Sequence, residues 1–298
     1  MPAVNRPKVI EIFDRGLVRR NRNRAAARFA EHDFLFKWTA EQLADRLKDI
    51  KREFAFVLQA GGRTKLDNIP GLQKMIAMDA AENFSSRPGV IADEEFLPFA
   101  DDSFDMVLSP LSLHTVNDLP GALIQINRVL KPDGLCLAAM LGGATLWELR
   151  QVMMQTEIAM RGGASPHVAP FASKQQAGAL MQRARFALPV VDSEKVTVTY
   201  DSLAKLMHDL RGMGEGNCLA DRGRMPLHKG FFTEAGRLYR EKFSEEDGRI
   251  RATFEIIFLI GWAPHGSQQK PLRPGSAEKR LSDALGTKEV GSGVKTTE

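Results

Sequence analysis

The stretch from Gly89 to Leu119, GVIADEEFLPFADDSFDMVLSPLSLHTVNDL, constrains the fold of this chain most. A short apolar run stops at Asp93, and a second apolar run, from Phe104 to Leu108, is long enough for a buried strand. A strand that ends in a carboxylate and leads through a loop to the next strand is typical of open α/β sheets. Such sheets bind ligands beyond the carboxyl ends of their strands. The stretch therefore predicts an α/β fold with a ligand site at that edge.

The order of an acid, LPF, DxSFD and a strand resembles the adenine-binding side of class I S-adenosylmethionine-dependent methyltransferases. The resemblance implies a Rossmann-like mixed sheet in which Asp93 faces the adenine amino group, with Glu94 beside it. The alternative interpretation of these residues is an ordinary acidic loop between a helix and a strand.

The main glycine motif of that superfamily is incomplete in this chain. An acid followed by GxGxG normally lets the backbone approach the methionine part of the cofactor. Here the loop reads LQAGGRT, so that Leu58 replaces the acid, and Ala60 and Thr64 replace the first and last glycines. Gly61 and Gly62 remain. The missing carboxylate weakens cofactor binding by roughly 1.5–3 kcal/mol, and we expect Ala60, Gly61 and Gly62 to approach the cofactor.

Three further residues are predicted at the cofactor site. Asp79 ends a predicted second strand, 17 residues after Gly62, where an acid typically binds the ribose hydroxyls; alternatively it is a helix N-cap. Ser109 and His114 follow the predicted fourth strand, and the position of His114 lines the cofactor pocket in related proteins. His114 could instead be a catalytic base, because the pKa of free histidine lies near neutrality.

The remaining pattern predicts an N-terminal helical arm and cap over residues 1–48 and a methyltransferase-like domain over 49–263. A helical insertion is expected at about 201–248, before the last strand. From 264 to 298 the composition becomes rich in Gly, Ser, Lys and Pro, which predicts a flexible tail. Residues 188–200 are expected to form a hairpin-like pair of strands.

Several segments together resemble one family, the mitochondrial complex I assembly factor 5 family, whose members are described as protein-arginine hydroxylases with a methyltransferase fold. The matching segments are IFDR (12–15), VIADEEFLPF (90–99), LSLHTVNDLP (111–120), VLKPDG (129–134), GGATLWELR (142–150), GGASPHVAPF (162–171), DLRGMGEGNC (209–218) and IGWAPHGSQ (260–268). The resemblance begins almost at the start of the sequence, so we expect a bacterial counterpart without a transit peptide.

This resemblance implies an arginine of the iron–sulfur subunit of NADH-quinone oxidoreductase as the substrate, S-adenosyl-L-methionine as the cofactor and hydroxylation as the reaction. A guanidinium substrate requires a carboxylate in fork geometry. Glu148 and Glu215 are the candidates because both lie in family-specific segments, and His167 is a third catalytic candidate. Each of the two acids could also be an ordinary surface acid. The six histidines lack the HxD pair of a 2-His-1-carboxylate iron site, so no metal is expected.

Two other functions are left open. The RAAARF stretch (24–29) also resembles the malonyl-carrier-protein methyltransferases of biotin synthesis, which would make the chain a genuine methyltransferase. The eroded glycine motif instead favours a non-catalytic assembly chaperone.

Charge and cysteine content indicate where such a protein works. The first 28 residues carry a net charge of +6 on an otherwise near-neutral chain. This arm suits an acidic partner, a membrane surface or nucleic acid, or is a solvated helix face; the resemblance favours a protein subunit over nucleic acid. Cys136 and Cys218 form neither a disulfide framework nor a zinc site and fit a reducing compartment. We expect a cytoplasmic protein, located at the inner face of the membrane.

Overall fold

The computed structural model describes residues 10–64, 66, 71–84, 89–223, 226–269, 282–283 and 286–287. Residues up to His265 form one compact unit, and a second unit begins at Gly266. Beyond Gln269 the predicted tail lies mostly outside the described residues.

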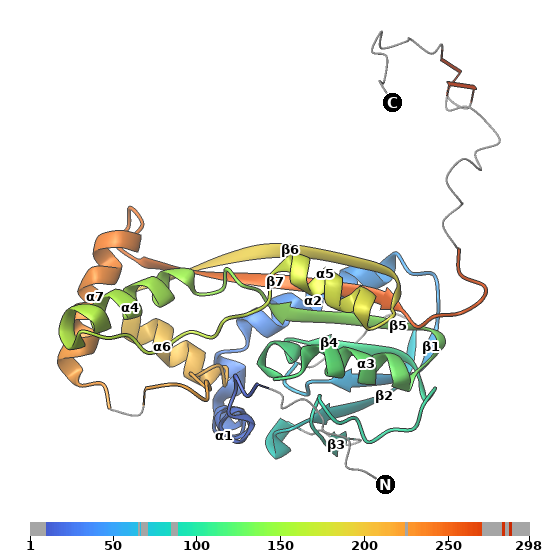
Figure 1. Ribbon diagram of the computed structural model, residues 1–298, viewed down its shortest axis with the longest axis horizontal. Coiled ribbons are helices and arrows are strands. Elements are labelled where there is room, and N and C mark those ends of the chain that lie inside the picture. The colour runs from blue at the N-terminus through green and yellow to red at the C-terminus, as the bar shows by residue number, and fades with distance from the viewer. Residues whose placement is uncertain are drawn as a thin grey trace. The chain divides into compact units, whose positions relative to one another are not determined.

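A seven-stranded mixed sheet forms the centre of the first unit (Figure 1). Its order is β3-β2-β1-β4-β5-β7-β6; β7 is antiparallel to both neighbours, and the other neighbouring pairs are parallel. The strands are β1 (Phe54–Ala60), β2 (Leu72–Asp79), β3 (Gly89–Ile91), β4 (Phe104–Pro110), β5 (Leu130–Leu141), β6 (Ala187–Tyr200) and β7 (Ile250–Trp262). The predicted α/β fold with a Rossmann-like mixed sheet is confirmed.

Two hydrophobic cores cover the two faces of the sheet, and the alternation of side chains along β5 divides them. Leu135, Leu137 and Ala139 belong to one core, and Cys136 and Ala138 to the other. Successive side chains of a strand point to opposite faces. Since all five are buried, β5 must be covered on both faces, as its continuous apolar sequence predicts.

Helices supply this cover. α2 (Phe34–Lys48) packs on the face that β4 and β5 present to the first core. α3 (Leu119–Val129) and α5 (Lys174–Arg183) pack on the other face, against β5, β6 and β7. The LKPDG segment (130–134), despite its proline and glycine, is part of β5 itself.

The helical insertion before the last strand is confirmed. α6 (Leu203–Gly212) and α7 (Lys229–Phe243) connect β6 to β7. β6 and β7 pair over their whole length, whereas β5 pairs with β7 only from Trp262 to Ile256. The end of β6 and the start of β7, beyond Ile256, therefore form a two-stranded ribbon. α4 (Trp147–Arg161) packs on α7 and β7 beside this ribbon (Figure 1).

The predicted hairpin over residues 188–200 is wrong. These residues form one strand, β6, at the edge of the sheet. The only irregularity is a register shift between Ala187 and Val190, around Pro189. An edge strand tolerates a proline at such a bulge because no inner ladder loses a hydrogen bond there.

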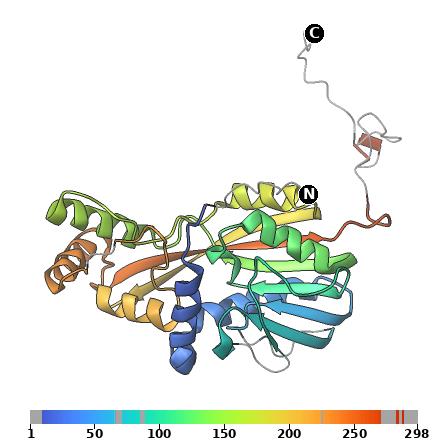
Figure 2. The same cartoon turned by 60° about the horizontal axis from the view of Figure 1, so that its bottom comes forward.

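The opposite half of the sheet has short connections. β1 and β2 are joined by residues 61–71, of which the described ones form no helix. The next connection contains the 3₁₀ turn η2 (Glu82–Phe84). The N-terminal segments α1 (Arg15–Ala25) and η1 (Ala26–Glu31, a 3₁₀ helix) lie between this half of the sheet and the insertion (Figure 2). α1 contacts η2 on one side and α6 on the other.

Candidate active site

Polar groups gather where three parallel strands end. Gly61 and Gly62 follow β1, Asp79 ends β2, and Ser109 lies near the end of β4. Because β2, β1 and β4 are neighbours in the sheet and run parallel, their carboxyl ends meet at one edge. The structure therefore brings these four predicted residues together.

The glycine loop lies against other parts of the chain. Gly61 has a φ of +104°, which favours glycine, and its N–H donates to the carbonyl of Met78 at 2.8 Å. A Cβ on Gly61 would lie 2.7 Å from the Cβ of Ser112, and one on Gly62 would lie 2.1 Å from the carbonyl oxygen of Phe84. Both positions therefore require glycine because protein atoms approach them closely.

The predicted residues Ala60 and Ser109 are joined through one hydroxyl. The Oγ atoms of Ser109 and Ser112 lie 3.0 Å apart, and the Ser112 hydroxyl donates to the carbonyl of Ala60 at 3.0 Å. All three residues are buried.

The carboxylate of Asp79 is fully buried and bonded within the chain. Its Oδ2 accepts the Gly62 N–H at 3.0 Å, and its Oδ1 accepts the Ala81 N–H at 2.8 Å. Oδ1 also accepts Nη1 of Arg22, from α1, at 3.2 Å. Arg22 is only 1% exposed, so this is a buried ion pair.

Glu94 and Asp93 are paired with arginines of the same helix. Arg22 donates to Glu94 Oε1 at 3.0 Å and to Thr115 Oγ1 at 3.2 Å. Arg15 donates to both oxygens of Asp93, at 2.6 and 3.2 Å, and to Glu94 Oε2 at 2.5 Å. Burial raises the pKa of Glu94, but the attraction of Arg22 and Arg15 outweighs it and lowers that pKa to about 2.

Arg63 lies in the glycine loop with its guanidinium buried. It donates to the carbonyl of Leu111 at 2.6 Å and to that of Met213 at 3.2 Å, and it pairs with Glu215. The ring of Phe36 lies under it, with the centroid 4.7 Å from the guanidinium carbon. Burial lowers the pKa of Arg63. The sequence offered no signal for this role beyond a cation at a variable position of the glycine motif.

Glu215 joins Arg63 to His114. Its Oε2 lies 3.1 Å from His114 Nε2. Burial alone would raise the pKa of Glu215, but the attraction of His114 and Arg63 lowers it. For His114 burial prevails over the attraction of Glu215 and lowers the pKa. The glycine-rich 212–217 segment is thus anchored at Glu215.

The residues at this edge do not fit an S-adenosylmethionine-type cofactor in this conformation. The carboxylates that would accept its ribose and adenine groups, Asp79 and Glu94, already accept Arg22, and the glycine positions face Ser112 and Phe84. Three buried polar atoms nearby have no hydrogen-bond partner: Arg63 Nε, Thr64 Oγ1 and His114 Nδ1. Most of the groups predicted to contact the cofactor therefore already contact other residues of the chain.

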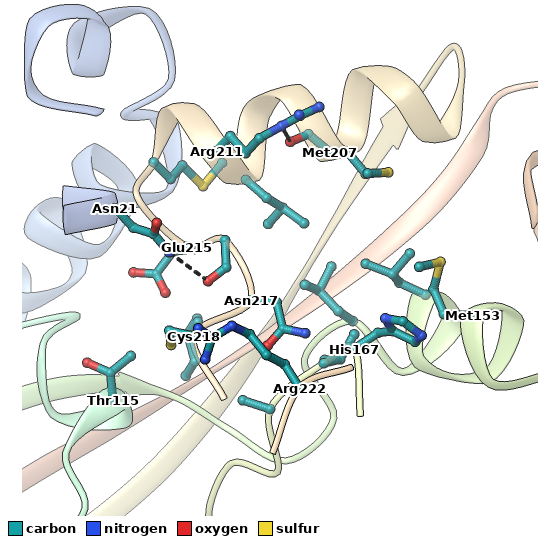
Figure 3. A pocket seen from close by; sticks show the side chains of 18 of the residues that line it. Asn21, Thr115, Met153, His167, Met207, Arg211, Glu215, Asn217, Cys218 and Arg222 are labelled. Atoms are coloured by element: carbon teal, nitrogen blue, oxygen red, sulfur yellow. Dashed lines mark hydrogen bonds between the residues drawn. The ribbon is translucent and has the colours of Figure 1, made fainter. Parts of the chain in front are cut away.

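A separate cavity of about 560 Å³ lies between the sheet and the insertion (Figure 3). Its walls are mainly apolar, with side chains such as Leu149, Met153 and Phe171. Glu215 lines it, and His167 appears well apart from Glu215 in Figure 3. The cavity therefore combines an apolar interior with polar groups from several segments, among them the cations Arg211 and Arg222.

The polar group near His167 contains an acid that sequence reasoning missed. Glu157 of α4 lines the cavity; its Oε2 lies 2.9 Å from His167 Nε2 and accepts the Ser165 N–H at 2.7 Å. Burial raises the pKa of Glu157, but these partners lower it overall. Helical spacing in the sequence could have placed Glu157 at the cavity. Leu149, Met153 and Glu157 follow one another at intervals of four residues and therefore share one face of α4.

Glu148 has a different environment from that expected of a guanidinium acceptor. It lies nine residues before Glu157, which places the two acids about 180° apart around α4. Its side chain is fully buried, where its oxygens accept the N–H of Thr253 at 3.2 Å and the hydroxyl of the same residue. Glu148 is not among the residues that line the cavity.

In the described part of the chain, no group of three or more His, Cys, Asp or Glu side chains is placed to hold a metal ion. The same part has no helix that is long and apolar enough to cross a membrane.

Comparison with known proteins gives consistent results. Residues 67–138 match the family model described as a methyltransferase domain. The chain is 42% identical over 285 residues to the human protein "Arginine-hydroxylase NDUFAF5, mitochondrial", a match that covers 91% of this chain and 82% of that protein. It is 31% identical to a malonyl-[acyl-carrier protein] O-methyltransferase of Halorhodospira halophila, over 89% of this chain and 93% of that protein.

Among solved structures, a Bacillus halodurans protein assigned as a methyltransferase superposes with a TM-score of 0.52 at 19% identity, covering 76% of this chain and all of that one. At this identity the likeness establishes the fold only. The methyltransferase domain implies a ligand of the S-adenosylmethionine type.

Proposed function

This chain belongs to the arginine-hydroxylase NDUFAF5 family, and from that premise we propose that it hydroxylates an arginine side chain of a protein substrate. It is an enzyme of the class I methyltransferase superfamily. The observation that carries the proposal is the extent of the relationship, which includes the insertion and α4 as well as the sheet. The substrate that we propose is the iron–sulfur subunit of NADH-quinone oxidoreductase, modified during assembly.

The cavity supports this choice of substrate. An arginine side chain has an apolar stem and a planar cation, and a site for it needs apolar walls and an acceptor in fork geometry. The cavity offers such walls, with Glu157 and Glu215 at its border. We propose Glu157, held by His167 and Ser165, as the acceptor. Glu215 faces the same space but is paired with the buried side chains of Arg63 and His114. Glu157 is paired with His167 and, at the longer distance of 3.7 Å, with Arg161.

Hydroxylation replaces a C–H hydrogen with a hydroxyl group. With dioxygen as the oxidant, the second oxygen atom becomes water, and an external two-electron reductant completes the balance. S-adenosylmethionine is our proposed ligand only for a conformation in which Arg22 has left Asp79 and Glu94, and no step of the reaction passes through it. We place the reaction in the cytoplasm at the inner face of the membrane, which the basic arm supports.

Two alternative functions have specific support. The relationship to malonyl-[acyl-carrier protein] O-methyltransferases favours methyl transfer to a carrier protein. The occupied carboxylates favour a non-catalytic assembly chaperone, because a chaperone needs the fold but not the cofactor.

Mass spectrometry of the proposed substrate tests all three functions. The iron–sulfur subunit would be produced with the wild-type protein, with the Glu157→Gln variant and alone. We expect one arginine to gain the mass of an oxygen atom with the wild-type protein, in a much smaller fraction of molecules with Glu157→Gln, and in none of the subunit produced alone. An added methylene mass on the subunit, or methylation of malonyl carrier protein in a parallel assay, would replace our proposal with methyl transfer. An unmodified subunit that copurifies with the chain would replace it with a chaperone.

A further inference from the structure

Helix α1 lies across the edge of the sheet where the fold binds its cofactor. Asn23 of α1 accepts the N–H of Asn83 at 3.1 Å, and Asn21 donates to the carbonyl of Gly216 at 3.3 Å. Immediately after α1, the ring of Phe29 packs edge-on against Phe84, with centroids 5.0 Å apart. The helix is thus fastened to η2 on one side and to the loop after α6 on the other.

Arg22 projects from this helix into a site built for a guanidinium group. Its two terminal nitrogens reach Asp79, Glu94 and Thr115 together, all at 3.0–3.2 Å. All four residues are nearly inaccessible to solvent. A planar fork with several donors satisfies such acceptors in a way that a point charge cannot. A surface ion pair would show neither this burial nor this number of partners.

The same acceptors are those that an S-adenosylmethionine-type ligand needs. In nucleotide-binding α/β sheets an acid at the end of the second strand accepts the ribose hydroxyls. Asp79 has that position, but one of its oxygens is already shared by Ala81 and Arg22, and the other is bonded to Gly62. Arg15 extends the network to Asp93. Because Asp79 and Glu94 are also inaccessible to solvent, a ligand cannot reach them in this arrangement unless Arg22 leaves.

We propose that α1 is an internal occupant of the cofactor site: Arg22 binds the Asp79–Glu94 carboxylates as a guanidinium ligand, and an S-adenosylmethionine-type molecule enters only when α1 withdraws. The site is therefore a guanidinium-binding site in the closed state. This inference does not depend on whether the chain hydroxylates, methylates or only binds its partner subunit.

The first test is calorimetric titration with S-adenosylmethionine. We expect saturable binding by the Arg22→Ala variant that is at least tenfold tighter than binding by the wild-type protein. Arg20→Ala, an exposed position on the same helix, is the matched control and should behave as the wild type. Arg22→Lys is the second variant, because it retains a charge for the buried acids and yet cannot reach all three partners. It should give an intermediate affinity.

Equal or weaker binding by both Arg22 variants would overturn the proposal, because Arg22 would then be irrelevant to the ligand or part of its site. Hydrogen exchange on the wild-type protein provides an independent measurement. We expect amides of α1 to be protected without ligand and to exchange faster at saturating S-adenosylmethionine; unchanged or increased protection with ligand bound would contradict mutual exclusion.

Chemical rescue tests the guanidinium site itself. Ethylguanidinium at low millimolar concentration should raise the melting temperature of Arg22→Ala, whereas ethylammonium should not. If neither cation, or both equally, raises the melting temperature of that folded variant, the site has no preference for a guanidinium group and the assignment fails.

Discussion

The two N-terminal helices each place an arginine against acids of the sheet, and the two arginines have opposite environments. Arg22 of α1 is buried on Asp79 and Glu94, at the half of the sheet with short connections. Arg46 of α2 lies over the ring of Phe258 on β7 and reaches acids on β6 that are about half exposed. In the half of the sheet that helices cover well, the arginine forms ion pairs at the surface. In the half without a described helix after β1, the arginine is buried and is itself part of the interior.

This difference indicates how a fold tolerates loss of its usual ligand contacts. Carboxylates at the ends of parallel strands cost free energy when buried without a partner. Here α1 supplies the partners, because Arg15 and Arg22 balance the acids that a cofactor would otherwise contact.

The largest effect is expected from Arg22→Ala. Removing one partner of a buried ion pair leaves Asp79 and Glu94 without compensation and should lower the free energy of unfolding by about 3–5 kcal/mol. Urea unfolding measures it, with Arg20→Ala as the control. A loss below about 1 kcal/mol, as for a surface pair, would remove the contrast between the two halves.

A pH dependence should follow from Glu94. The pKa of this carboxyl is about 2 in the folded protein, against its ordinary value of 4.5. Since the folded-state pKa is depressed, the stabilisation is complete above pH 4.5 and is lost as the pH falls toward 2. We expect a loss of about 3 kcal/mol over this window, measured by unfolding at several pH values. Glu94→Gln should flatten the curve, and Glu41→Gln, at an exposed acid, should not.

At the cavity, Glu157→Gln should slow modification of the subunit by at least about tenfold, equivalent to ~1.4 kcal/mol of transition-state binding. The amide retains the shape and the Ser165 contact but loses the charge that attracts a guanidinium. Initial rates from peptide mass spectrometry measure this, again with Glu41→Gln as the control. A normal rate would show that Glu157 has only a structural role.

The smallest effect is expected from Arg46→Ala. Its acids are half exposed and its ring contact is a single cation–π pair. The free energy of unfolding should fall by about 0.5–1 kcal/mol, and the loss should shrink in high salt. A loss as large as that of Arg22→Ala would mean that the two arginines have equivalent roles.

Much of the fold could be predicted from the sequence because its signals are local. Apolar runs that end in acids marked β2 and β3, a longer apolar run marked β4, and the helical pattern before the last strand marked the insertion. The single strand β6 was missed because Asp192, Ser193 and Glu194 interrupt its apolar residues as a turn would. In the structure they continue the edge strand and pair with β7. The gathering of Gly61, Gly62, Asp79 and Ser109 followed from strand order alone.

The sequence by itself determined the type of sheet, the family and the loss of the glycine motif, because these depend on residue identity and order. Only the tertiary structure decided what contacts the predicted acids. Arg22 meets Asp79 across 57 residues of chain, and Arg63 meets Glu215 across 152. The composition of the basic arm was visible, but which of its arginines would be buried was not. That choice depends on how α1 packs between η2 and α6, where long-range contacts, not local pattern, determine which charges leave water.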